Sequence, residues 1–312
     1  MKKNLTKKLM LSVLTLAFAV VSLGASTFAW FTMSSNAKVS SFDANVKGAE
    51  GLEIAITSTS YENTTDNVDK LVWYSGVLPT TAINAQIAEG FFFEALNSQG
   101  KGSFQKLNHT TAKLEAASEG YISFRLWFKS GVSDNLCLTD MNIEGPETVP
   151  TYTIDQEFVI ASNTALTAKV GEKWAFDVAN AARVSLVPQG LAEDDAAFVY
   201  EAKEVAGTDK NAGNKLGYET TNGAFEYYND KVSAEGIKLT APSEVAPKSK
   251  QVTDLDKTPT AADVILALEA DKAAYVDVYV WIEGWDGECL NAIFDQLLTV
   301  DFEFYLEDKL TA

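Results

Sequence analysis

Two tryptophans and two carboxylates near the C-terminus are the residues whose types and spacing best suit ligand chemistry. Trp281, Glu283, Trp285 and Asp286 follow one another within a short stretch. An indole ring can pack on the face of a sugar, and carboxylates accept hydrogen bonds from hydroxyl groups. The cluster therefore suggests a ligand platform, as in a monomeric exported adhesin or carbohydrate-binding module. Its plainer interpretation is a strand end and turn with a packed aromatic side chain.

Enzyme chemistry finds little support, because His109 is the single histidine of the 312 residues. A Ser-His-Asp or Cys-His site would have to use it. A zinc protease of the H-E-x-x-H type needs two histidines on one helical face, and no G-x-S-x-G nucleophile turn is present. We therefore predict no catalytic, cofactor-binding or metal-ligating residue and no enzyme activity. An exported hydrolase or metalloprotease is the last alternative.

The chain has two cysteines, Cys137 and Cys289. Outside the cell they could form a disulfide, provided that their backbones come within bridging distance, which the sequence leaves open. Two thiolates fall short of the four ligands of a structural zinc site.

Charge narrows the choice of partners. The 25 basic and 43 acidic residues give a formal net charge of −18. Such a surface repels phosphate backbones and anionic lipid headgroups, which argues against nucleic-acid and membrane-surface binding. Calcium-dependent association is an option, although an acidic surface that merely keeps the protein soluble is the simpler interpretation.

The N-terminus has the parts of a secretory signal peptide. Lys2, Lys3, Lys7 and Lys8 precede an apolar run over residues 9–23, and small residues follow. This order, in a run shorter than the roughly 20 residues of a membrane span, is typical of a cleaved leader. We predict a signal helix over residues 1–29 and cleavage between Ala29 and Trp30. The protein is then secreted to the outside of the cell and touches the membrane only through the uncleaved signal.

The elements that position these residues are strands, because apolar residues alternate with polar ones. The clearest segments are 121–129, 275–283 and 299–306, and weaker ones are 38–47, 52–57, 152–161 and 183–187. Alternation with period two indicates strands with one face in the core and one in water, as in antiparallel sheets. We predict Val278, Val280, Phe302 and Phe304 in the core. Residues 264–268 fit either helix or strand.

The predicted fold class is all-β, an antiparallel β-sandwich formed by residues 30–312 as a single domain. Two segments interrupt the alternation, residues 58–120 and 191–262. We interpret them as loop and short-helix insertions at the ends or edges of the sandwich, with a short helix near residues 85–96.

The junction Gly24-Ala25-Ser26-Thr27-Phe28-Ala29-Trp30-Phe31-Thr32 resembles the signal-to-mature junction of the TasA/camelysin group, in which a Gly-Thr-aromatic-Ala element follows the apolar core. Here Ala25 and Ser26 separate the glycine from the threonine. A second stretch, residues 278–286, resembles a strand and turn of related secreted Firmicutes proteins. The resemblance implies a jelly-roll-like sandwich, export through a dedicated signal peptidase, and assembly into extracellular matrix fibres. It also implies metalloprotease activity as a rival, which a single histidine supports poorly.

The new N-terminus suggests how such a fibre forms. Trp30, Phe31, Phe42 and Val46 lie in a partly alternating segment, residues 30–47, directly after the predicted cleavage site. Such a segment can add a strand to a neighbour's sheet, and head-to-tail exchange propagates as a homopolymer. We expect this donor strand to be freed by signal cleavage. The alternative is that residues 38–47 pair within their own subunit.

Overall fold

The computed structural model describes residues 42–89, 91–108, 113–153, 158–159, 167–192, 195–202, 250–252, 255, 263–284, 286, 289, 293 and 296–307. These residues are mostly in β-strands, as predicted, with three short helices among them. The predicted signal segment 1–29, the start of the donor segment and His109 lie outside the described residues.

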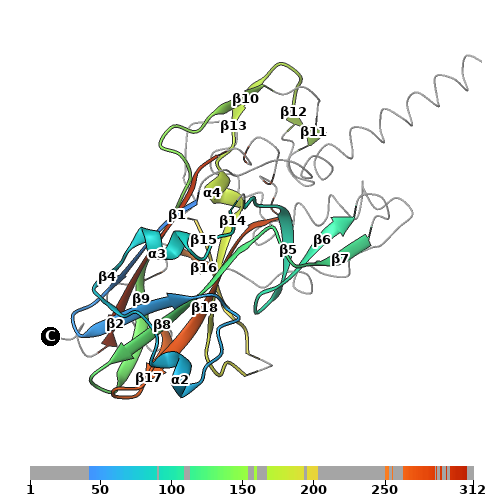
Figure 1. The fold of residues 1–312 in the computed structure, drawn as a ribbon. Coiled ribbons are helices and arrows are strands. Elements are labelled where there is room, and N and C mark those ends of the chain that lie inside the picture. The colour runs from blue at the N-terminus through green and yellow to red at the C-terminus, as the bar shows by residue number, and fades with distance from the viewer. Residues whose placement is uncertain are drawn as a thin grey trace, which may run out of the picture.

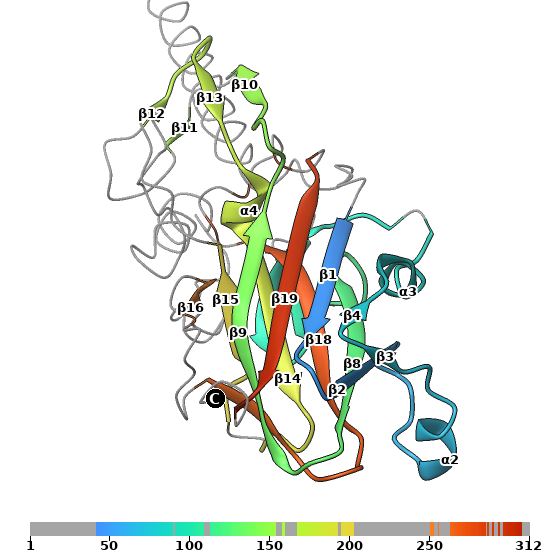
Figure 2. The ribbon, with the colours of Figure 1, turned by 90° about the vertical axis from the view of Figure 1, so that its left-hand side faces the viewer.

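The first sheet has five strands in the order β17-β9-β19-β1-β4 (Figure 2). Their bounds are β17 (Val264–Leu268), β9 (Asp134–Glu144), β19 (Leu298–Leu306), β1 (Phe42–Gly48) and β4 (Val77–Leu78). The long antiparallel ladder of β9 and β19 forms its centre. The last described strand, β19, thus lies beside the first, β1.

The second sheet lies behind the first (Figure 2) and is centred on β18, which pairs with β14 on one side and β8 on the other. Its main strands are β16 (Lys250–Gln251), β15 (Phe198–Glu201), β14 (Ala182–Pro188), β18 (Ala274–Glu283), β8 (Ile122–Ser130), β2 (Leu52–Thr57) and β3 (Tyr74–Ser75). A three-stranded wing joins the end of β18 (Figure 1): β5 (Ala95–Gly100), β6 (Ser103–Asn108) and β7 (Lys113–Ala117).

The core lies between the two sheets. Phe128 of β8 and Phe304 of β19 meet across them with ring centroids 4.9 Å apart. The four predicted core residues, Val278, Val280, Phe302 and Phe304, are all buried. In β19 buried and half-buried residues alternate along the whole strand, so one face of this strand faces the core, as its sequence predicts.

Short helices and hairpins complete the described chain. The helices are α2 (Thr65–Val68), α3 (Thr80–Asn84) and α4 (Val178–Ala181). The pairs β10 (Thr151–Thr153) with β13 (Lys173–Ala175), and β11 (Phe158–Val159) with β12 (Thr167–Ala168), form two small separate ladders.

Several predictions of strands are confirmed, and others are corrected. Segments 52–57, 121–129, 183–187, 275–283 and 299–306 form β2, β8, β14, β18 and β19, and the ambiguous 264–268 is strand β17. Within segment 152–161 the described residues belong to two strands, β10 up to Thr153 and β11 from Phe158, which pair with different partners. The helix expected near residues 85–96 is wrong: α3 ends at Asn84, and Leu96 belongs to β5.

The sheets are also not purely antiparallel. β1 runs parallel to β19, β16 parallel to β15, and β5 parallel to β18. Segment 58–120 contributes more than loops, because its strands β3 and β4 extend the two sheets and β5 carries the wing. Segment 191–262 supplies β15 and β16 to the second sheet.

Candidate functional site

The first strand, β1, is the element of the predicted donor segment that the structure describes. All seven of its residues pair in parallel with β19, from Phe42 beside Leu298 to Gly48 beside Phe304. Ala44 and Val46 are fully buried in the core. On the outer side, Asn45 Nδ2 donates a hydrogen bond of 2.7 Å to Asp301 Oδ1. Strand β1 therefore pairs with β19 in one defined register, and its inward side chains fill the core.

A short turn connects β1 to the rest of the fold. The Ala49 N–H donates to the Phe304 carbonyl at 3.0 Å, and the Leu52 N–H donates to the Ala49 carbonyl at 3.1 Å. Gly51 has φ +87°, a left-handed conformation that glycine adopts without a Cβ penalty. Because β2 belongs to the opposite sheet, this turn is the described link between β1 and the following chain.

The far edge of β1 is only partly covered by a strand. β4 pairs with Val46 and Lys47 alone. Pro79 then ends β4 and precedes α3, whose Ile83 side chain is fully buried in the core. Proline cannot continue a ladder, since it lacks the N–H. The chain thus closes this edge with a two-residue strand and a helix rather than with a long strand (Figure 2).

The structure describes two of the four residues predicted to anchor the donor strand. Trp30 and Phe31 lie outside the described residues. Phe42 begins β1, and Val46 is buried within its own subunit. In the single chain the described part of the donor segment is therefore a strand of the subunit's own sheet, as the alternative interpretation expected.

The predicted ligand platform is corrected by burial. Trp281, Glu283 and Asp286 are at most 3 % exposed, and Trp285 lies outside the described residues. The Trp281 Nε1–H donates to Glu283 Oε2 at 3.0 Å. Phe104 of the wing packs on Trp281, with 5.2 Å between ring centroids. All three side chains are buried, Trp281 beneath the wing, so they cannot receive a sugar at the surface.

Asp286 belongs instead to a buried charge cluster around Arg183. The guanidinium Nη2 lies 2.7 Å from Asp286 Oδ2 and 3.2 Å from Glu201 Oε2, and Nη1 donates to the Asn180 carbonyl at 2.8 Å. Burial lowers the pKa of Arg183, but the charges of Asp286, Glu201 and Glu283 outweigh it and raise the pKa overall. Arg183 is therefore a permanent cation that ties β14, β15 and the segment after β18 together.

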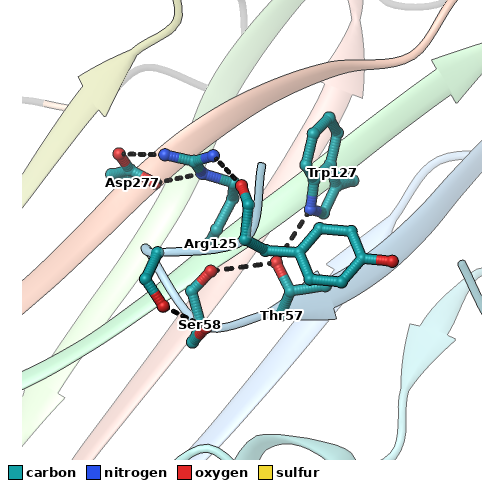
Figure 3. A network of polar contacts seen from close by, with 7 residues as sticks. Thr57, Ser58, Arg125, Trp127 and Asp277 are labelled. Carbon is teal, nitrogen blue, oxygen red and sulfur yellow. Dashed lines mark hydrogen bonds and ion pairs between the residues drawn. The ribbon is translucent and has the colours of Figure 1, made fainter. Parts of the chain in front are cut away.

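A second network, which the sequence did not reveal, lies on the outer face of β8 and β18 (Figure 3). Arg125 donates to both oxygens of Asp277 and to the Tyr61 carbonyl. Its guanidinium stacks 3.7 Å from the Tyr275 ring centroid. The neighbouring Trp127 donates to Thr57 Oγ1 at 2.9 Å. The signal was the opposite charges of Arg125 and Asp277, which become informative only once β8 is known to pair with β18.

Both cysteines are free and buried, so the disulfide that the sequence left open is not formed in this structure. Cys137 lies on β9, and Cys289 belongs to the main core cluster. Burial, with nearby Glu307, Asp263 and Asp134, raises the pKa of the Cys137 thiol to about 11.

The part of the chain that the structure describes holds neither a metal-binding cluster nor a membrane-spanning helix. No group of three or more His, Cys, Asp or Glu side chains there could hold a metal ion. No helix there is long and apolar enough to cross a bilayer. In comparisons with known proteins, no family model, no curated protein and no solved structure matches the chain.

Proposed function

We propose that the protein is a secreted structural subunit of an extracellular or biofilm-matrix fibre, which assembles by donation of its N-terminal strand after signal cleavage. Its fold is then a jelly-roll-like sandwich, and its main partner is a second copy of itself. The signal-to-mature junction and the acidic composition support export, with a signal peptidase as the processing enzyme.

The observation that carries the proposal is the position of β1. It is the first described strand, it pairs with β19 over its whole length, and it continues into the fold through the Ala49–Gly51 turn. If that turn opens, a neighbour's β1 can make the same contacts to β19 and bury the same Ala44 and Val46. Exchange of an identical element costs little, because no native contact has to be redesigned.

Strand exchange of this kind extends into a filament, because the chain of subunits does not close into a ring. Each subunit gives its β1 to one neighbour and receives β1 from another, which is a heterologous, head-to-tail interface. A subunit whose own β1 has left would expose the unpaired edge of β19 and part of its apolar core. Both features favour binding of another β1 strand there. The uncleaved signal would keep the donor segment at the membrane, so cleavage acts as the trigger.

Cross-linking tests where β1 lies. Lys47 and Glu303 are direct partners across β1 and β19, and backbones at that spacing suit a disulfide. In the variant Lys47→Cys/Glu303→Cys of residues 30–312, oxidised fibres should give a ladder of covalent oligomers on a non-reducing gel. The single variant Lys47→Cys is the control. Fibres that dissolve into cross-linked monomers would refute strand donation.

Electron microscopy tests the fibre itself. The chain beginning at Trp30 should form filaments, and the chain without residues 30–47 should form none. The variant Ala29→Trp should stay membrane-attached and unpolymerised, because a bulky residue blocks the predicted cleavage site. Normal fibres from that variant would remove signal cleavage as the trigger.

A further inference from the structure

Resting on the proposed function, we infer that the Asn45–Asp301 pair is the specificity element of assembly. It admits β1 of a second copy of this chain in a single register. Asn45 is one of the outward-facing residues of β1, and its amide lies 2.7 Å from the Asp301 carboxylate. In a fibre this hydrogen bond would join two subunits.

The end of β1 sets how far the strand can enter. A Cβ on Gly48 would lie 2.9 Å from Ile54 Cδ1 and 3.2 Å from Leu52 Cδ2. The core surface under this position is therefore filled by β2. A larger residue at this place would have to push buried side chains aside, which a packed core resists.

Each wrong register conflicts with the faces of the sheet, with positions 45 and 48, or with the core. A slip of one residue turns every side chain to the other face of the sheet. A slip of two residues that advances the strand puts Asp43 in the place of Asn45, opposite Asp301, and Val46 in the place of Gly48. The first change opposes two carboxylates, and the second places a branched side chain against Ile54.

The opposite slip of two residues fails for a different reason. It would move Gly48 into the fully buried place of Val46. The core would then lose the packed side chain, at a cost of roughly 1–3 kcal/mol. Only the observed register forms the Asn45–Asp301 hydrogen bond, places a glycine next to Ile54 and fills the core with Val46.

The pair also distinguishes strands by charge. Asp301 is partly buried on a strand whose next outward residue is Glu303. A strand that brings a carboxylate to position 45 is therefore repelled, whereas an amide can donate to Asp301. The substitution Asp301→Asn reverses this preference, because the acceptor then offers an amide that can donate to a carboxylate at position 45.

This reciprocity gives a two-component test with residues 30–312. Asn45→Asp places two carboxylates together in its own fibre and should polymerise at least tenfold more slowly than wild type. Mixed one to one with Asp301→Asn, it should polymerise at close to the wild-type rate, since each contact between the two variants pairs one carboxylate with one amide. The double variant N45D/D301N in one chain should also polymerise, because its pair again joins one carboxylate to one amide.

Mass spectrometry of the mixed fibres should find the two variants in equal amounts. The inference is overturned if Asn45→Asp alone polymerises like wild type, or if the mixture contains no more fibre than its two components separately. If the wild-type chain forms fibres but either of these results is obtained, strand donation is still supported and only the role of the Asn45–Asp301 pair is refuted. Absence of wild-type fibres removes the proposed function itself.

Discussion

Arg125 and Asp277 form a two-pronged ion pair across the β8–β18 ladder, with Nε–Oδ1 at 2.6 Å and Nη2–Oδ2 at 2.9 Å. The guanidinium is held from three further sides, by the Tyr61 carbonyl and by the rings of Tyr275 and Trp127. Planar guanidinium suits such bidentate and stacked contacts better than an ammonium group does. The pair thus fixes the segment after β2 onto the outer face of the second sheet.

Removal of this guanidinium should strongly destabilise the fold. The Arg125 and Asp277 side chains are 9 % and 15 % exposed, so Arg125→Ala leaves a largely buried carboxylate without its cation. We expect a loss of about 3 kcal/mol in the free energy of unfolding, measured by urea denaturation. Lys129→Ala is the control, because its ion pair with Glu53 is more exposed and should contribute less than about 1 kcal/mol. Equal losses would show that the network is no more than a surface pair.

The wing offers a second prediction through Gly102. This residue has φ +77°, and a Cβ on it would lie 2.2 Å from Tyr279 Cζ. Gly102→Ala should therefore displace the Tyr279 ring from its packing with Phe104, in addition to straining the backbone. Gly100 is the matched control, since it has φ +89° and no atom within 4 Å of such a Cβ.

The alanine at position 100 should cost only the backbone strain, on the order of 1 kcal/mol. Near-ultraviolet circular dichroism and urea denaturation should show a larger effect for Gly102→Ala than for Gly100→Ala. Identical effects of the two substitutions would mean that the wing does not pack on Tyr279 in solution.

Asp177, the N-cap of α4, gives a prediction about pH. Burial raises the pKa of Asp177, and the negative charge of Glu144 raises it further. The hydrogen bond that Asp177 accepts from the Ala179 N–H lowers the pKa but does not cancel the rise. A carboxyl whose pKa is raised by folding stabilises the fold below its unfolded pKa, and that contribution is lost as the pH rises through the folded value. At neutral pH the ionised Asp177 therefore lowers stability relative to a neutral amide.

Asp177→Asn should keep the cap and remove this charge. We expect a higher free energy of unfolding than wild type at pH 7, and a smaller difference at pH 4. Asp177→Ala loses the cap and should cost about 1 kcal/mol. Urea denaturation at both pH values checks this; an asparagine variant as unstable as the alanine variant at pH 7 would contradict it.

Alternation along the sequence predicted the strands well, because it reports the two faces of one strand. It predicted the buried face of β19 and the bounds of β2. It could not predict what other segments place on the outer face. Trp281 and Trp127 face outward from the core and are nevertheless buried, because the wing covers one and the chain around Tyr61 packs on the other.

The candidate site shows the same limit at longer range. The sequence marked residues 38–47 as a strand with an apolar face, which Ala44 and Val46 confirm. Nothing local to that segment specifies its parallel partner, since β19 begins about 250 residues later. The Asn45–Asp301 hydrogen bond depends on that pairing, so it could be recognised only in the structure.

The two cysteines provide the last prediction. Burial first, and then the nearby carboxylates, raise the pKa of Cys137 to about 11, and burial raises the pKa of Cys289 well above its ordinary value. At pH 8 only about one Cys137 in a thousand would be thiolate, which is the reactive form. Both thiols should therefore resist a thiol reagent in the native protein and react fully in guanidinium chloride. A native mass that shows the loss of two hydrogens, with a peptide linking Cys137 to Cys289, would contradict two separate buried thiols.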